Sequence, residues 1–185
     1  MRPILLSLPL VLTAVACRPA TTDRPAATDS TPPATAQAEP WTIRLDGVGP
    51  LTFGMSLAQA RAALGDSLAV TPPDASCGFT VPRGAPAGVR LMVEAAKVVR
   101  VDVDSAGTRT AAGAEVGMAE ADVRGRYSDG LQVRPHKYDP KGRYLIVQGT
   151  AADSAQRLIF ETDGQRVVRY RAGVTPAVEY VEGCA

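Results

Sequence analysis

Few residues of this chain could do chemistry, and their spacing does not bring them together. The sequence has one histidine, His136, and no Gly-x-Ser-x-Gly, Ser-x-x-Lys or His-x-x-x-His pattern, so neither an activated serine nor a histidine metal site is indicated. Asp102 and Asp104 could act as a carboxylate pair. They lie opposite the apolar alternation of residues 99–103, however, where solvated charges explain them more simply. We therefore expect no enzyme, no catalytic residue, no metal site and no cofactor.

The densest group of polar and aromatic residues is the stretch 136–143, His-Lys-Tyr-Asp-Pro-Lys-Gly-Arg. Its Asp-Pro-Lys-Gly centre is typical of a turn. Two interpretations stay open for this loop. It is either a solvated connection or a loop that contacts a partner through His136 and Tyr138, and no nearby nucleophile would make it catalytic.

The N-terminus is typical of an exported lipoprotein. Met1 to Ala16 begins with a basic residue and continues in an apolar run that is shorter than the roughly 20 residues needed to span a bilayer. Residues 1–16 are therefore predicted to be a signal peptide. Residues 12–17 read Leu-Thr-Ala-Val-Ala-Cys and resemble a bacterial lipobox. Cys17 is therefore the expected site of lipid attachment. Arg18, rather than an aspartate, follows the cysteine, and this resembles the pattern of outer-membrane lipoproteins.

Residues 17–40 are predicted to be the lipidated N-terminus and a linker rich in Ala, Thr and Pro, a composition with little to pack. The formal net charge of the whole chain is +1, and loss of the signal peptide, which contains one arginine, brings it to zero. A neutral chain exerts no long-range attraction on nucleic acid. We expect contact with the membrane through the lipid anchor only.

Two cysteines remain once Cys17 is assigned to lipid attachment. Cys77 lies in a strand-like stretch and Cys184 lies one residue from the end of the sequence. Exported proteins oxidise such pairs where geometry permits, so a disulfide between Cys77 and Cys184 is predicted. A redox-active pair is disfavoured because the chain has no Cys-x-x-Cys spacing.

One stretch of the chain occurs twice. Residues 54–64 and 117–127 both begin with Gly-Met and continue as a short helical pattern, 63 residues apart. In the first copy Ser56 is a good N-cap, and Gln59 three residues later completes a capping box. Each copy is followed by two strand-like runs that suggest a hairpin, and the second copy has a further strand at 144–148.

These features resemble a known family. A Gly-Met turn, a short helix and a meander that ends in Lys/Arg-Val-Val-Arg resemble the small lipoproteins of the SmpA/OmlA (BamE) outer-membrane-assembly type. Two such units in tandem resemble the beta-lactamase-inhibitor-protein-like fold. The resemblance implies an α+β fold of two tandem helix-plus-antiparallel-meander modules, at 41–107 and 108–185, with their sheets side by side and their helices on one face.

The favoured function is a membrane-anchored, non-enzymatic protein-binding or envelope-assembly module at the periplasmic face of the outer membrane. Its expected contact surface is the sheet face that no helix covers, which would display Arg100, Asp102, Arg169 and Arg171 alongside the loop residues His136 and Tyr138. Exposed charges of this kind contribute little to stability, within about 0.5 kcal/mol. Tyr170, between two of the arginines, is expected on the buried face.

The partner would be another envelope protein or an exported protein. Two alternatives stay open. A small exported hydrolase would use unusual carboxylates gathered with His136 in a pocket, and a purely structural envelope protein would recruit no stoichiometric partner.

Replacing the lipobox cysteine tests the anchor. We expect Cys17→Ser to release the protein from the membrane, because acyl chains on Cys17 would supply the anchoring free energy. Fractionation of cells that express each form measures this. A wild-type protein found outside the membrane fraction would contradict the prediction.

Overall fold

A computed structural model describes residues 41–65, 68–71 and 76–184, which belong to one compact unit. The predicted signal peptide, Cys17 and the linker to residue 40 lie outside the described residues. Among the residues described, no helix is long and apolar enough to cross a membrane.

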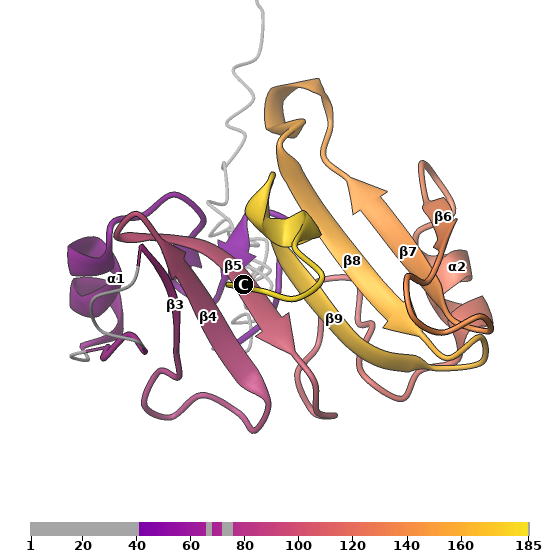
Figure 1. Ribbon diagram of the computed structural model, residues 1–185, viewed down its shortest axis with the longest axis horizontal. Helices are drawn as coiled ribbons and strands as arrows, with labels where there is room; N and C mark the ends of the chain where they lie inside the picture. The colour runs from indigo at the N-terminus through magenta and orange to yellow at the C-terminus, as the bar shows by residue number, and fades with distance from the viewer. Residues whose placement is uncertain (1–40, 66–67, 72–75, 185) are drawn as a thin grey trace, which may run out of the picture. The chain divides into compact units, whose positions relative to one another are not determined.

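The main element is a seven-stranded antiparallel sheet with the order β3-β4-β5-β9-β8-β7-β6 (Figure 1). The chain forms two meanders, and β5 joins them by pairing with β9. The strands are β3 (Cys77–Thr80), β4 (Val89–Glu94), β5 (Lys97–Val103), β6 (Gln132–Pro135), β7 (Arg143–Gln148), β8 (Gln156–Thr162) and β9 (Val167–Val174).

The remaining elements are short. They are the paired strands β1 (Gly47–Val48) and β2 (Leu51–Thr52), the helices α1 (Leu57–Leu64) and α2 (Glu120–Arg126), and the 3-10 turns η1 (Ala151–Asp153) and η2 (Ala177–Glu179).

Helix α1 begins and ends where the sequence predicts. The Ser56 hydroxyl accepts a hydrogen bond from the Gln59 amide at 3.2 Å, and the Gln59 side chain accepts one from the Ser56 amide at 2.9 Å. This reciprocal pair is the predicted capping box. Gly65 ends the helix in the left-handed conformation, with φ 61°.

Both helices pack against the same apolar core. Ala60 of α1 and Val123 of α2 are fully buried, in one cluster with Leu91, Phe160 and Tyr170 of the sheet. The Tyr170 hydroxyl donates a hydrogen bond to the Thr108 carbonyl at 2.9 Å, so its polar atom is satisfied inside the core. The predicted register of β9 is therefore confirmed, because Tyr170 faces the core while Arg169 and Arg171 point to the opposite face.

The prediction of two helix-plus-meander modules is wrong. All seven strands belong to one continuous sheet, and the helices contribute only eight and seven residues. The repeat correctly indicated local hairpins, but the β5–β9 ladder aligns Val101 with Ala172 and Val103 with Tyr170. These apolar side chains are buried in a single core, since an unpaired strand edge at the centre of the chain would leave main-chain groups unsatisfied.

After β9 the chain turns back over the sheet face that carries no helix, and we call residues 175–184 the C-terminal segment (Figure 1). It begins at a cis Thr175–Pro176 bond and ends at a disulfide between Cys77 and Cys184, with Cα atoms 5.5 Å apart. The predicted pairing is confirmed, and it agrees with an exported chain.

The disulfide is expected to stabilise the fold strongly. Its two cysteines are 107 residues apart, and closing a loop of that size contributes about 4 to 5 kcal/mol in the chain-entropy model. Cys77→Ser combined with Cys184→Ser should lower the free energy of unfolding by a large part of this amount, as measured by urea denaturation. An unchanged unfolding midpoint would contradict the prediction.

Candidate functional site

Charged side chains of opposite sign alternate across the sheet face that lies under the C-terminal segment. Arg90 on β4 pairs in register with Asp102 on β5, which pairs in turn with Arg171 on β9. Two residues before Arg171 on the same strand, Arg169 pairs with Glu161 on β8. Cross-strand neighbours share a face, so each acid has a basic residue directly opposite.

Arg100 connects this face to the C-terminal segment. Its Nε and one terminal nitrogen donate to the two carboxylate oxygens of Asp102, at 2.9 and 2.5 Å. The other terminal nitrogen donates to the carbonyls of Ala177 and Tyr180, at 3.1 and 2.6 Å. The guanidinium thus makes four hydrogen bonds, two on each side, and Arg100 is only 4% exposed.

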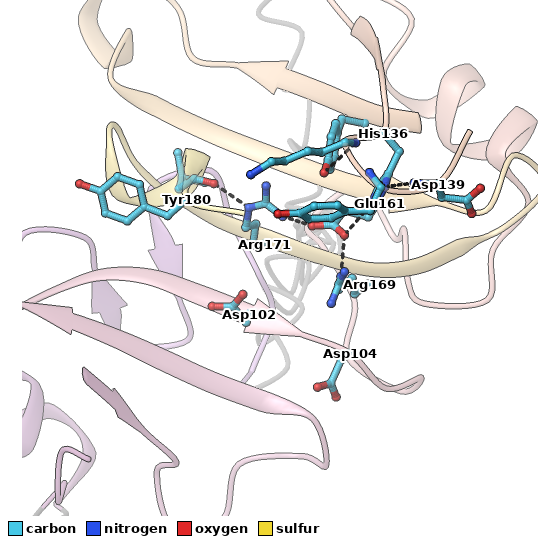
Figure 2. A network of polar contacts seen from close by, with 12 residues as sticks. Asp102, Asp104, His136, Asp139, Glu161, Arg169, Arg171 and Tyr180 are labelled. Carbon is cyan, nitrogen blue, oxygen red and sulfur yellow. Dashed lines mark hydrogen bonds and ion pairs between the residues drawn. The ribbon is translucent and has the colours of Figure 1, made fainter. Parts of the chain in front are cut away.

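Arg171 has a similar role one strand away. Its Nε donates to the Val178 carbonyl at 2.6 Å, and one terminal nitrogen donates to Glu161 (Figure 2). Arg171 is 3% exposed. The expectation that Arg100 and Arg171 are displayed on an open face is therefore wrong, because the C-terminal segment covers both side chains and accepts their hydrogen bonds.

Glu161 lies at the centre of the network. It is 1% exposed, and its carboxylate also accepts from Arg169 Nε at 2.6 Å and lies 3.2 Å from His136 Nε2. Burial by itself would raise the pKa of Glu161, but Arg171, Arg169 and His136 outweigh this effect, so the pKa lies below the usual value for glutamate. The residue is a buried anion with three partners.

His136 links the buried network to the surface. Its Nδ1 accepts hydrogen bonds from the amides of Tyr138 and Asp139, at 3.2 and 3.0 Å. Nδ1 therefore carries a lone pair, and Nε2 carries the hydrogen that points at Glu161. The ring also stacks on Tyr144, with 4.6 Å between centroids. His136 therefore fixes the main chain at Tyr138 and Asp139, near the start of the loop that follows it.

The loop between β6 and β7, residues 136–142, is tied to the C-terminal segment as well. Lys137 Nζ donates to Glu182 at 3.1 Å, and the Tyr138 hydroxyl donates to the same carboxylate. At the far end of the loop, a Cβ on Gly142 would lie 2.7 Å from the Thr162 carbonyl, so this close approach requires glycine. The predicted loop is therefore held in one shape although it is solvent-exposed at Tyr138 (59%).

A cleft of about 200 Å³ opens beside the C-terminal segment. This is smaller than most small-molecule sites, which measure about 300 to 1,000 Å³. Asp102 and Glu161 in its wall already accept hydrogen bonds at both oxygens, and Asp104 is 3.7 Å from Arg90. No group of three or more His, Cys, Asp or Glu among the described residues could hold a metal ion. The charges of the cleft stabilise one another.

The structure brings most of the residues singled out in the sequence into one network. Arg100, Asp102, Arg169, Arg171 and His136 take part in it, and Tyr138 lies at its exposed end. Figure 2 shows Arg169, Arg171 and His136 around Glu161.

Sequence reasoning missed Glu161, the residue on which these contacts converge. The signal was present in the predicted hairpin, because its register places this one acid opposite Arg169.

Comparison with known proteins adds little to these observations. No family model and no curated protein matches the chain. One solved structure, an extracellular protein containing an SCP domain from Bacillus anthracis, is 14% identical, with a TM-score of 0.46. The match covers 66% of this chain and 44% of that protein. A likeness at this level assigns neither a fold family nor a function.

Removing the buried charge tests the network. Glu161→Gln keeps the shape of the side chain but leaves Arg171 buried without a counterion, so we expect unfolding to become easier by about 3 kcal/mol or more. The matched control is Asp46→Asn. Asp46 forms an exposed ion pair with Arg44, so this substitution should lower the free energy of unfolding by less than about 1 kcal/mol. Thermal unfolding measures both, and equal effects would contradict the assignment.

The depressed pKa of Glu161 also predicts a pH dependence. The unfolded chain takes up a proton at the ordinary glutamate pKa, about 4.3, whereas the folded protein does so only at lower pH. The stabilisation is therefore complete above the unfolded-state pKa and is lost as pH falls through the folded-state value. Urea unfolding over this acid range should show a shallower pH dependence for Glu161→Gln than for the wild type.

Proposed function

We propose that this chain is an exported lipoprotein, anchored at Cys17, whose sheet domain binds another protein of the cell envelope and catalyses no reaction. The periplasmic face of the outer membrane is the proposed location. The lipobox-like sequence supports the anchor, and the disulfide supports export. The proposed contact surface is the exposed loop 136–142 with the adjoining edge of the sheet.

The observation behind this proposal is that an exposed loop is ordered by a buried ion pair, whose burial is unfavourable in free energy. Burying a carboxylate and a guanidinium costs several kcal/mol in solvation, and apolar residues would often stabilise a fold as well. Here the Glu161–Arg171 pair, through His136, fixes the amides of Tyr138 and Asp139. A loop that is already ordered loses less conformational entropy when a partner binds.

The chemistry of the loop suits a protein partner. Tyr138 is 59% exposed, and the neighbouring Lys137 ammonium lies 4.9 Å from the centre of its ring. Arg169, whose side chain is 54% exposed, stands on the same face. Tyrosine and arginine are the residue types most enriched at energetically important interface positions.

The hydrolase alternative lacks a comparable observation. It would need Asp102, Asp104 or His136 in a pocket with a second catalytic group. Both oxygens of Asp102 accept from Arg100, Asp104 lies 3.7 Å from Arg90, and His136 Nε2 faces Glu161, whose oxygens are held by Arg169 and Arg171. A general base must instead be able to reach the proton that it removes.

Site-specific photo-crosslinking of the full-length protein in its own membrane tests the proposal. A photoreactive phenylalanine derivative at Tyr138 should give one discrete adduct with another protein. The same residue at Val81, which is 64% exposed and lies in another part of the sequence, serves as the matched control and should give none.

The possible results separate the alternatives. An adduct at neither position would favour a purely structural role and overturn the proposal. Equal adducts at both positions would mean random collision, and would overturn the choice of surface.

A further inference from the structure

A basic hollow of about 320 Å³ lies at the β6 end of the sheet. Its wall contains the cations Arg134, Lys141 and Arg143, the apolar Pro135 and Pro140, and no carboxylate. All three cations are exposed. The lining of the hollow is therefore positively charged, unlike that of the cleft beside the C-terminal segment, where acids and arginines balance.

The three cations have little of their hydrogen-bonding capacity occupied by described residues. Among the described residues, the one side-chain hydrogen bond of Arg134 goes to the Gln132 side chain at 3.3 Å. Arg143 lies 3.6 Å from Glu120, but that carboxylate is bound more closely by Arg124 at 2.7 Å. Within the described part of the chain no ion pair involves Lys141. An arginine carries five donors and a lysine three, so most of them remain available.

The same place offers a free strand edge. β6 is the last strand of the sheet, and among the residues that the structure describes it pairs only with β7 (Figure 1). The His136 amide donates to the Gly142 carbonyl, so even-numbered residues of β6 point their main-chain groups at β7. Val133 and Pro135 consequently point theirs outward. The opposite edge differs, because Thr71 exchanges two hydrogen bonds with Phe79 of β3, at 2.8 and 2.9 Å.

We propose that an extended, acidic segment of the partner protein pairs with the β6 edge and places its carboxylates in the basic hollow. The outward amide and carbonyl of Val133 supply the main-chain hydrogen bonds, as in other strand-addition complexes. Pro135 has no amide hydrogen, so the paired stretch is short, and the cations supply the selectivity.

A second copy of this chain is a poor occupant of the edge. Pairing β6 with β6 would bring Arg134 and its neighbouring cations against the same cations of the other copy, and like charges facing one another across a strand pair are destabilising. The inference names the partner's chemistry at the proposed contact surface, and so it rests on the proposed function.

Peptide binding to the full-length protein in detergent micelles tests the inference. The probe is an end-blocked, fluorescent peptide of alternating Glu and Val, measured by anisotropy. One control peptide replaces every Glu with Gln, and another replaces every Val with Pro. We expect the Glu-Val peptide to bind at least tenfold more tightly than either control, and its binding to weaken as salt is added.

Two variants assign the binding to the edge. Lys141→Gln combined with Arg134→Gln should weaken binding of the Glu-Val peptide at least tenfold. Lys97→Gln, the same change at an exposed lysine on β5, should leave it within twofold. Val133→Pro removes the outward amide without removing a hydrogen bond to β7, and should also abolish binding while thermal unfolding stays near the wild-type temperature.

Each contrary result overturns the inference. Equal binding of the Glu and Gln peptides would show that the cations do not recognise the carboxylates. Equal binding of the proline peptide would show that the peptide does not pair with the strand edge. If Lys97→Gln weakened binding of the Glu-Val peptide as much as the double variant does, the assignment of binding to the β6 edge would be wrong. If position 138 crosslinks to a partner but the peptide does not bind, the proposed function stands and this inference fails. Peptide binding without any crosslink would overturn the proposed function, and would leave the β6 edge as a site for acidic segments without a partner at Tyr138.

Discussion

The ion pair between Glu161 and Arg171 is the interaction on which the polar half of this fold depends. Both groups are almost completely removed from water, and either charge alone would cost several kcal/mol. The register of β8 and β9 places them diagonally, with Arg169 directly opposite the acid. A shift by one residue would exchange the core face and the polar face. The network therefore holds only in this register.

The C-terminal segment completes this arrangement because it supplies acceptors that the sheet lacks. The guanidinium groups of Arg100 and Arg171 extend above the sheet and donate to three carbonyls of the C-terminal segment. Apolar clusters on both sides, one around Tyr144 and one around Met92, include Val178 and Ala177 of the same segment. The disulfide to β3 and the contacts of Glu182 with the β6–β7 loop fix the segment at two further places.

The inner and outer charges of this domain have different physical roles. Charges under the C-terminal segment pair with one another, and Arg100, Arg171 and Glu161 among them are closed to water, so they determine shape. Charges at the β6 edge, such as Arg134 and Lys141, are exposed, unbalanced and adjacent to free main-chain groups. Interfaces are built from ordered, accessible groups whose pairing is incomplete, which is why the proposed contact lies at the edge and the loop.

The sequence by itself determined the local elements of this domain. The Ser56 cap, the hairpins and the facing of Tyr170 follow from residue types and short spacings. The cysteine pairing followed from the two cysteines that remain once Cys17 is assigned to lipid attachment in an exported chain.

Only the tertiary structure decided that the hairpins share one sheet and that Arg100 and Arg171 are buried. The shared sheet and the burial of Arg100 rest on contacts between residues some 70 to 80 positions apart, between β5 and β9 and between Arg100 and Tyr180. Arg171 is buried by Val178, which is close in sequence but reaches it only because the C-terminal segment turns back over the sheet. Periodicity shows which face of a strand is apolar, but not which strand or segment covers the other face. That depends on the free energy of long-range pairing, which no local pattern contains.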